Sequence, residues 1–346
     1  MNKKIFGSLI VLIIAIGSIS AHPDEENPKD IFYSGLAFRI QKTGKFHINM
    51  VHLSESYSNS IYGIFASAYL NQVNGNFKEC INKFTTVINT KPISDSRLVS
   101  EAYFYMGNCN FDLGNYDLAI NNYSQTISFD RENNATETYL NSMLERAKTY
   151  NRIRRFDLAK NDITSAIQRI ENEIQFDQYY NLEQLHIDRI ALNVTLKEYN
   201  QAIPDCDWII NNSKDKKDMG YLHRGQIKYK FLQDYDGGFT DYKKAFEINP
   251  NNFSAIASSI EVLNTRKEYS EIPIYVTKAL KIKPRLGVLY YTRGYFLEQL
   301  GNRKDACIDM KESLKYTSEN VTRDSEGYYS FDHIPAAKSF INSMCK

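Results

Sequence analysis

The sequence repeats itself at an interval of 34 residues. Three positions of the repeat keep their residue type over one such step: Tyr235 and Tyr269, Ala245 and Ala279, and Pro250 and Pro284. An interval of about 34 residues is typical of a hairpin of two helices, and successive hairpins stack so that each buries its apolar faces against its neighbours. The interval therefore predicts an all-α solenoid of antiparallel helix pairs. Such arrays usually present an extended surface rather than a catalytic pocket.

The clearest unit runs from Ser100 to Asn133. In its first half, apolar residues follow one another at helical spacing up to Gly114, a residue type that readily closes a helix in a left-handed conformation. Gly107 and Ala119 have little or no side chain, so we expect the two helices of the hairpin to cross at these residues.

This order of small and aromatic residues resembles the tetratricopeptide repeat family. The same order returns in six further units, marked by Ala68 and Phe77, Ala147 and Phe156, Tyr199 and Ala202, Gly225 and Tyr235, Tyr269 and Ala279, and Gly294 and Ala306. The resemblance implies a helix-pair solenoid coiled into a right-handed superhelix, in which the first helices of the repeats line a concave groove.

The resemblance covers about seven repeats over residues 61–320. Residues 22–60 are expected to hold a spacer, and Gly44 and Phe46 leave open whether residues 31–57 form a degenerate eighth repeat. Residues 321–346 are expected to form a loop and then a helix. Such a helix would cap the apolar face of the last repeat, which a solenoid must cover.

Residues 1–21 have the three parts of a secretory signal peptide. Lys3 and Lys4 precede an apolar run, which gives way to small residues ending at Ala21. The competing interpretation is an uncleaved anchor, but the run is shorter than the ~20 residues that span a bilayer. We therefore expect cleavage after Ala21, a periplasmic or secreted location, and no membrane span in the mature chain.

Charge and motifs exclude several classes of function. The mature chain would hold 40 basic and 41 acidic residues, because residues 1–21 contain two lysines and no acid. This balance does not predict nucleic-acid binding, which calls for a clustered basic face. The sequence contains no phosphate-binding glycine loop, zinc-protease helix or nucleophile elbow. Its histidines are isolated and are interpreted as surface or hydrogen-bonded core residues. We therefore expect no catalysis, no metal and no cofactor.

The five cysteines do not form a disulfide framework in sequence. Their spacing is scattered and their number is odd, so at least one thiol stays unpaired in a monomer. Most are interpreted as small buried residues at helix interfaces. A Cys80–Cys109 bridge between neighbouring repeats is the alternative.

Aromatic residues predict where a partner binds. We expect them to form an exposed stripe along the groove, supplemented by two asparagines that could bond an extended peptide backbone. The predicted groove residues are Tyr62, Phe65, Tyr69, Phe104, Tyr105, Asn108, Phe111, Asn151, Tyr229, Tyr291 and Tyr295. The alternative is that the aromatics near the N-terminus pack against the degenerate repeat or against each other.

The sequence thus predicts a non-catalytic scaffold or adaptor that binds a protein or peptide outside the cytoplasm. A structural subunit of a cell-envelope assembly is the first alternative. A glycan-binding envelope protein, which would use aromatic platforms in the groove, is the second.

Overall fold

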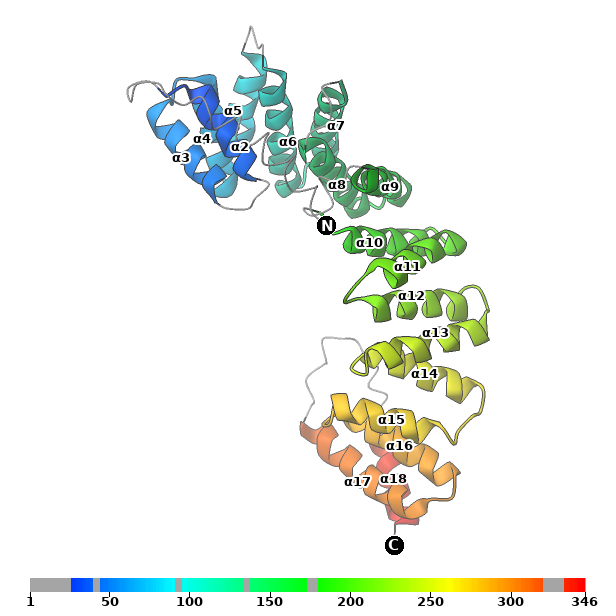
Figure 1. Cartoon of the computed structure of the whole chain (residues 1–346). Coiled ribbons are helices and arrows are strands. Elements are labelled where there is room, and N and C mark those ends of the chain that lie inside the picture. Colours follow the sequence, from blue (N-terminus) through cyan, green and yellow to red (C-terminus); the bar gives the residue numbers. More distant parts are fainter. Residues whose placement is uncertain are drawn as a thin grey trace, which may run out of the picture. The chain divides into compact units, whose positions relative to one another are not determined.

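The computed structural model describes residues 26–39, 44–90, 95–132, 137–172, 180–319 and 333–345. These residues form seventeen helices and no strand (Figure 1). The chain divides into two compact units, residues 1–155 and 156–346, called here the first and the second unit. The predicted signal peptide and the predicted loop that follows residue 320 lie outside the described residues.

The first unit holds helices α2 to α8 and the second holds α9 to α18. In the first unit the helices are α2 (Pro28–Arg39), α3 (Lys45–Ser56), α4 (Ile61–Val73), α5 (Phe77–Asn89), α6 (Ser96–Asp112), α7 (Tyr116–Glu132) and α8 (Glu137–Arg152). In the second unit they are α9 (Phe156–Asn172), α10 (Leu182–Thr195), α11 (Tyr199–Asn212), α12 (Lys217–Lys230), α13 (Tyr235–Ile248), α14 (Phe253–Thr265), α15 (Ile272–Ile282), α16 (Gly287–Gln299), α17 (Arg303–Glu319) and α18 (Ile334–Met344).

Within each unit, consecutive helices pack against one another as hairpins. In the first unit α4 pairs with α5 and α6 with α7, and in the second α10 pairs with α11, α12 with α13, α14 with α15, and α16 with α17. The predicted all-α helical-repeat solenoid is confirmed. Residues 31–57 contain most of α2 and all of α3, which pack against each other. At the other end, α18 packs against α17.

Side-chain caps start many of these helices. In each case the residue before the helix accepts a hydrogen bond from the backbone N–H three residues further on, which satisfies a donor that the helix itself leaves free. The capping residues are Ser60, Asp95, Asn181, Asp234 and Asn252. Short polar residues between apolar runs thus fix where the helices of the solenoid begin.

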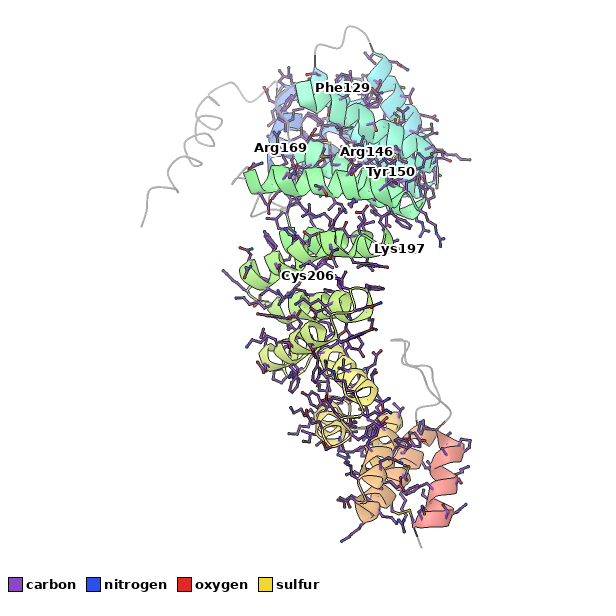
Figure 2. All side chains as sticks on the ribbon, turned by 90° about the vertical axis from the view of Figure 1, so that its right-hand side faces the viewer. Phe129, Arg146, Tyr150, Arg169, Lys197 and Cys206 are labelled. Atoms are coloured by element: carbon purple, nitrogen blue, oxygen red, sulfur yellow. A yellow bond between two sulfur atoms is a disulfide. The ribbon has the colours of Figure 1, made fainter. Side chains whose placement is uncertain are left out.

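The turn between the two helices of a hairpin requires a left-handed residue. Glycine supplies it at Gly75, Gly114 and Gly301, where φ is 77 to 80°. Four other turns use larger residues, with φ between 58 and 62°: Arg154, Lys197 (labelled in Figure 2), Gln233 and Lys267. A side chain in this conformation strains the backbone, because its Cβ crowds the carbonyl oxygen.

Replacing Lys267 with glycine is expected to stabilise the protein by about 1 kcal/mol. Relief of the left-handed strain, ~1–2 kcal/mol, exceeds the added flexibility of glycine in the unfolded chain. Chemical denaturation measures the change. Asn264→Gly is the matched control, since Asn264 is an exposed residue within α14. The control should destabilise the protein instead, and a loss of stability in both variants would contradict the strain argument.

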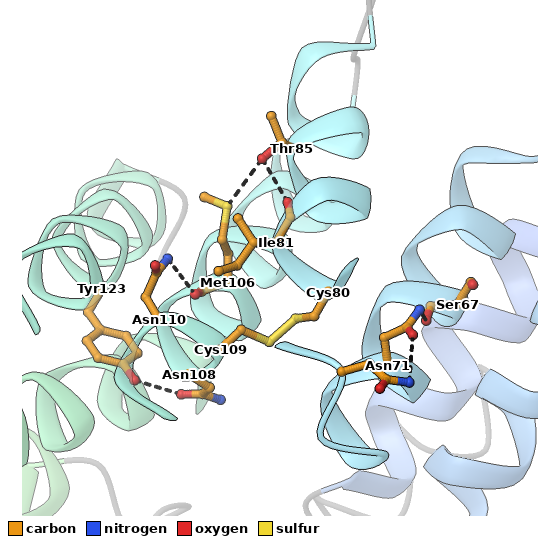
Figure 3. Close-up of a disulfide and its surroundings, with 11 residues drawn as sticks. Ser67, Asn71, Cys80, Ile81, Thr85, Met106, Asn108, Cys109, Asn110 and Tyr123 are labelled. Carbon is orange, nitrogen blue, oxygen red and sulfur yellow. Dashed lines mark hydrogen bonds between the residues drawn. A yellow bond between two sulfur atoms is a disulfide. The ribbon is translucent and has the colours of Figure 1, made fainter. Parts of the chain in front are cut away.

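Gly107 lies where α6 packs closely against α7. A Cβ at Gly107 would lie 2.6 Å from Cε1 of Tyr123. Tyr123 is fully buried, and its hydroxyl donates to Oδ1 of Asn108 at 2.8 Å (Figure 3). The same arrangement recurs at Gly225, whose Cβ would lie 2.8 Å from the ring of Tyr242. The missing side chain therefore makes room for the aromatic residue of the second helix.

Candidate binding surfaces

The predicted aromatic stripe of the first unit is not an exposed surface, and this part of the prediction is wrong. Phe65 is fully buried, and Phe104 and Tyr105 are only 8% and 6% exposed. They belong to one core cluster with Phe84. The alternative interpretation, packing against the N-terminal segment and one another, describes what the structure shows.

Helix α2 covers part of this aromatic cluster. The ring of Phe32 lies 4.9 Å from that of Phe65 and 5.5 Å from that of Tyr62. The hydroxyls of Tyr33 and Tyr62 donate to the two carboxylate oxygens of Asp95, at 2.5 and 2.7 Å. Burial opposes ionisation of Asp95, but these hydrogen bonds and the N–H of Leu98 outweigh it and lower its pKa. The cap of α6 therefore also holds α2.

The last residue of α2 reaches two further first helices. The Arg39 guanidinium donates to Glu101 of α6 at 2.5 Å, and to Glu137 and Thr138 of α8 at 3.3 and 2.9 Å. Glu101 is fully buried, so its charge depends on Arg39 for compensation. The hydroxyl of Thr138 also donates a hydrogen bond to Oε1 of Glu101. Through α2, the first helices of this unit are joined to one another and their shared face is occupied.

The other predicted residues of the first unit are partly accessible and have partners within the protein. Tyr69 packs edge-on against Phe46 at 5.1 Å, and Phe111 lies under the Lys148 ammonium at 4.9 Å. Asn108 accepts the hydrogen bond from Tyr123. Asn151 is exposed in the last turn of α8, where its carbonyl accepts from the N–H of Arg154. These residues do not form one continuous binding stripe.

In the second unit, two of the three predicted aromatics lie together. The rings of Tyr291 and Tyr295 in α16 stack at 6.4 Å, and Tyr295 is 45% exposed. Tyr291 also packs against His333, which precedes α18, at 5.3 Å. Tyr229 instead packs inside its own hairpin, against Tyr235 at 5.3 Å. Among the predicted groove aromatics, Tyr295 is therefore the most exposed, and it lies beside the partly exposed Tyr291.

Sequence reasoning missed a repeated ion pair that joins the two helices of a hairpin. Three arginines of first helices bond the carboxylate of a buried aspartate sixteen or seventeen residues later: Arg189 forms three hydrogen bonds with Asp205, and Arg224 and Arg293 form two each, with Asp241 and Asp309. Two of the arginines stand directly before the glycine of the repeat, at Gly225 and Gly294. This spacing was visible in the sequence and could have revealed the pair.

Four of the five cysteines form disulfides: one bridge is the alternative stated above, and the other was not predicted. Cys80 of α5 and Cys109 of α6 form a disulfide between neighbouring hairpins (Figure 3). Cys307 of α17 is bonded to Cys345, directly after α18. Cys206 keeps a buried free thiol, and burial raises its pKa to about 12. The second bridge ties the terminal helix to the last hairpin.

Neither a metal site nor a membrane-spanning helix was found in the part of the chain that the structure describes. No group of three or more histidine, cysteine or acidic residues there could hold a metal ion. Among the same residues, no helix combines the length and the apolar character needed to cross a membrane.

Comparison with known proteins supports the architecture. Residues 220–252, which span most of α12 and all of α13, match the family model of the tetratricopeptide repeat. No curated protein matches the sequence. The C-terminal part of a repeat-containing protein from Cytophaga hutchinsonii is 16% identical, with 74% of this chain and 96% of that chain covered and a TM-score of 0.55. A tetratricopeptide repeat protein from Parabacteroides merdae is 14% identical, with coverages of 81% and 98% and a TM-score of 0.46. The likeness to the Cytophaga structure is one of fold. Residues 220–252 are therefore similar to a tetratricopeptide repeat, and they lie within an all-α helical-repeat solenoid.

Proposed function

We propose that the protein is an exported, non-catalytic scaffold that binds a protein or peptide partner outside the cytoplasm. The observation that carries the proposal is the stacking of helix hairpins, an architecture that offers a long surface to a partner. The tetratricopeptide repeat at residues 220–252 supports it, because the fold suggests protein interaction.

Two features support export. The first is the sequence of residues 1–21, with its basic start, apolar run and small residues before His22. The second is the pair of disulfides, Cys80–Cys109 and Cys307–Cys345. Disulfides persist in oxidising compartments and are rare in the cytosol, where thiols are kept reduced.

Intact-mass measurement on protein recovered from an exporting host should therefore show two changes. The chain should begin at His22, and its mass should fall by four hydrogens for the two disulfides. Under denaturing conditions only one thiol, Cys206, should react without reductant. A full-length chain with five reactive thiols in the cytoplasmic fraction would contradict export.

The partner is expected to contact the Tyr291–Tyr295 pair. Exposed aromatic side chains are frequent anchors at interfaces, and truncating one typically costs ~2 kcal/mol, or about thirtyfold in affinity. With the mature full chain as bait in an envelope extract, Tyr295→Ala should reduce recovery of the partner by that order. Tyr235→Ala is the matched control, since Tyr235 is 51% exposed but begins a second helix. Equal recovery with both variants would contradict this placement of the surface.

Exposed apolar residues on second helices favour a structural subunit as the second candidate. In the second unit, Ile274 of α15 and Ile308 of α17 are each more than half exposed. A subunit that used this face should co-purify with its assembly in fixed proportion. Recovery would then be lost with Ile274→Lys or Ile308→Lys and would be unaffected by Tyr295→Ala.

A further inference from the structure

One hairpin of the second unit departs from the repeat pattern by carrying the only tryptophan of the chain. Trp208 in α11 stands three residues after Asp205, the aspartate of the repeated ion pair. The same position, three residues after the aspartate, holds Lys244 in α13 and Glu312 in α17. A position that carries a charged side chain in other hairpins therefore carries a large aromatic residue here.

The indole of Trp208 rests on a layer of side chains that fixes its position. The ring of His186 stacks on it, with centroids 4.0 Å apart and planes 21° from parallel. Nδ1 of His186 lies 2.7 Å from Asp205, which in turn accepts three hydrogen bonds from Arg189. In the hairpins of Arg224 and Arg293 the residue corresponding to His186 is a tyrosine. The histidine support is thus specific to the hairpin that carries the tryptophan.

This support leaves a buried polar atom without a partner. His186 is 2% exposed, and its Nε2 makes no hydrogen bond within the described residues. The closest acceptor noted, Oε1 of Glu171, is 3.7 Å away, beyond hydrogen-bond distance. A buried polar group without a hydrogen bond is unfavourable for folding. This layer therefore points to a role for the tryptophan that it supports.

Trp208 lines a pocket of about 340 Å³ at the edge where second helices lead into the next first helices. The remaining lining residues are Tyr180, Asn181, Leu182, Glu183, Asp215 and Lys216. Glu183 and Lys216 lie 3.7 Å apart as an ion pair, which leaves Asp215 as the uncompensated charge of the lining among the residues that the structure describes. Two carboxylates, an amide and an ammonium thus line the pocket together with the indole of Trp208, and His186 stacks on that indole.

We propose that this pocket binds a neutral sugar, with one face of the sugar ring on Trp208. A sugar ring has an apolar face, which suits an indole, and hydroxyls at its edge, which suit mixed donors and acceptors. Asn181, Glu183 and Asp215 would bond the hydroxyls. The volume lies near the lower end for small-molecule sites and suits one or two rings. An anion would be repelled by Asp215, and a cation, which Asp215 would attract, is the competing ligand that the experiment below includes as choline. The site is additional to the proposed protein-binding surface.

The single tryptophan makes the test direct, because all indole emission comes from Trp208. The folded mature chain is titrated with neutral monosaccharides and their disaccharides: glucose, galactose, mannose, N-acetylglucosamine, cellobiose, laminaribiose and chitobiose. At least one sugar should change the emission with a saturable curve, while choline chloride and inorganic phosphate should not. Failure of every sugar to give saturable binding, or equal binding of choline, would overturn the proposal.

Variants separate the site from the fold. By calorimetry on the folded variant, Trp208→Lys, which installs the residue type of position 244, should weaken sugar binding at least tenfold. Trp208→Phe should retain part of the affinity. Tyr295→Ala is the control and should bind sugar normally. Undiminished binding by folded Trp208→Lys would place the sugar elsewhere and contradict the proposal.

Discussion

Replacing Phe65 with alanine is expected to lower the free energy of unfolding by about 3–5 kcal/mol, as is usual for a large aromatic in a packed core. Phe65 is fully buried, and its ring contacts those of Phe32, Phe84 and Tyr105 at 4.9, 5.0 and 5.8 Å. Its removal leaves a cavity between α2, α4, α5 and α6. Urea denaturation followed by circular dichroism measures the loss. Phe231→Ala is the control, because Phe231 is 40% exposed and should cost far less.

The damage from Phe65→Ala should also be local. In a helical-repeat array each hairpin contacts mainly its neighbours, so stability is roughly a sum of local terms. Hydrogen exchange should accelerate in the hairpins of the first unit and stay nearly unchanged in α16 and α17. Unchanged unfolding in urea would contradict the burial of Phe65. Equal acceleration along the whole chain would contradict the independence of the hairpins.

Replacing Arg39 with methionine is expected to destabilise the protein by about 3–5 kcal/mol. The change removes the guanidinium that compensates Glu101, and an uncompensated buried charge is expensive. Methionine keeps much of the length of the arginine side chain, so the lost stability reports mainly the removal of the charge. Urea denaturation at neutral pH measures it. Lys148→Met is the control, because the exposed Lys148–Glu145 pair should contribute less than about 1 kcal/mol.

A double variant distinguishes the charge from the packing. Arg39→Met combined with Glu101→Gln removes both members of the buried pair, so most of the lost stability should return. If the double variant is as unstable as the sum of the single changes, Arg39 and Glu101 act independently. That result would contradict the account of how α2 is held.

The repeat interval was enough to predict the fold, because a hairpin must place small and apolar residues at fixed steps to pack on its neighbours. Gly107 and the residues around it indicated where the two helices of one hairpin cross, and Gly114 indicated where the chain turns between them. Turns built on Lys197 or Gln233 gave no such signal, since these residues adopt the left-handed conformation only because the surrounding hairpin imposes it.

The candidate site could be predicted only in part. A stripe of aromatics on a first helix has the same sequence pattern whether it faces solvent or another helix. In the first unit the stripe faces another helix, because α2 packs there and its Arg39 bonds Glu101, 62 residues later in the sequence. The spacing of the cysteines also does not show which of them form disulfides, because a bridge such as Cys307–Cys345 depends on where the terminal helix packs.

Helix α2 covers the face formed by the first helices of the first unit, whereas Tyr291 and Tyr295 stay accessible in the second unit. Hydroxyl-radical footprinting of the mature full chain, read by mass spectrometry, tests this difference. Tyr295 should be oxidised as fast as the exposed Tyr235, and Phe65, Phe104 and Tyr105 should be protected until the chain is unfolded in denaturant. Oxidation of Phe65 and Tyr105 in the folded chain at the rate of Tyr295 would contradict the claim.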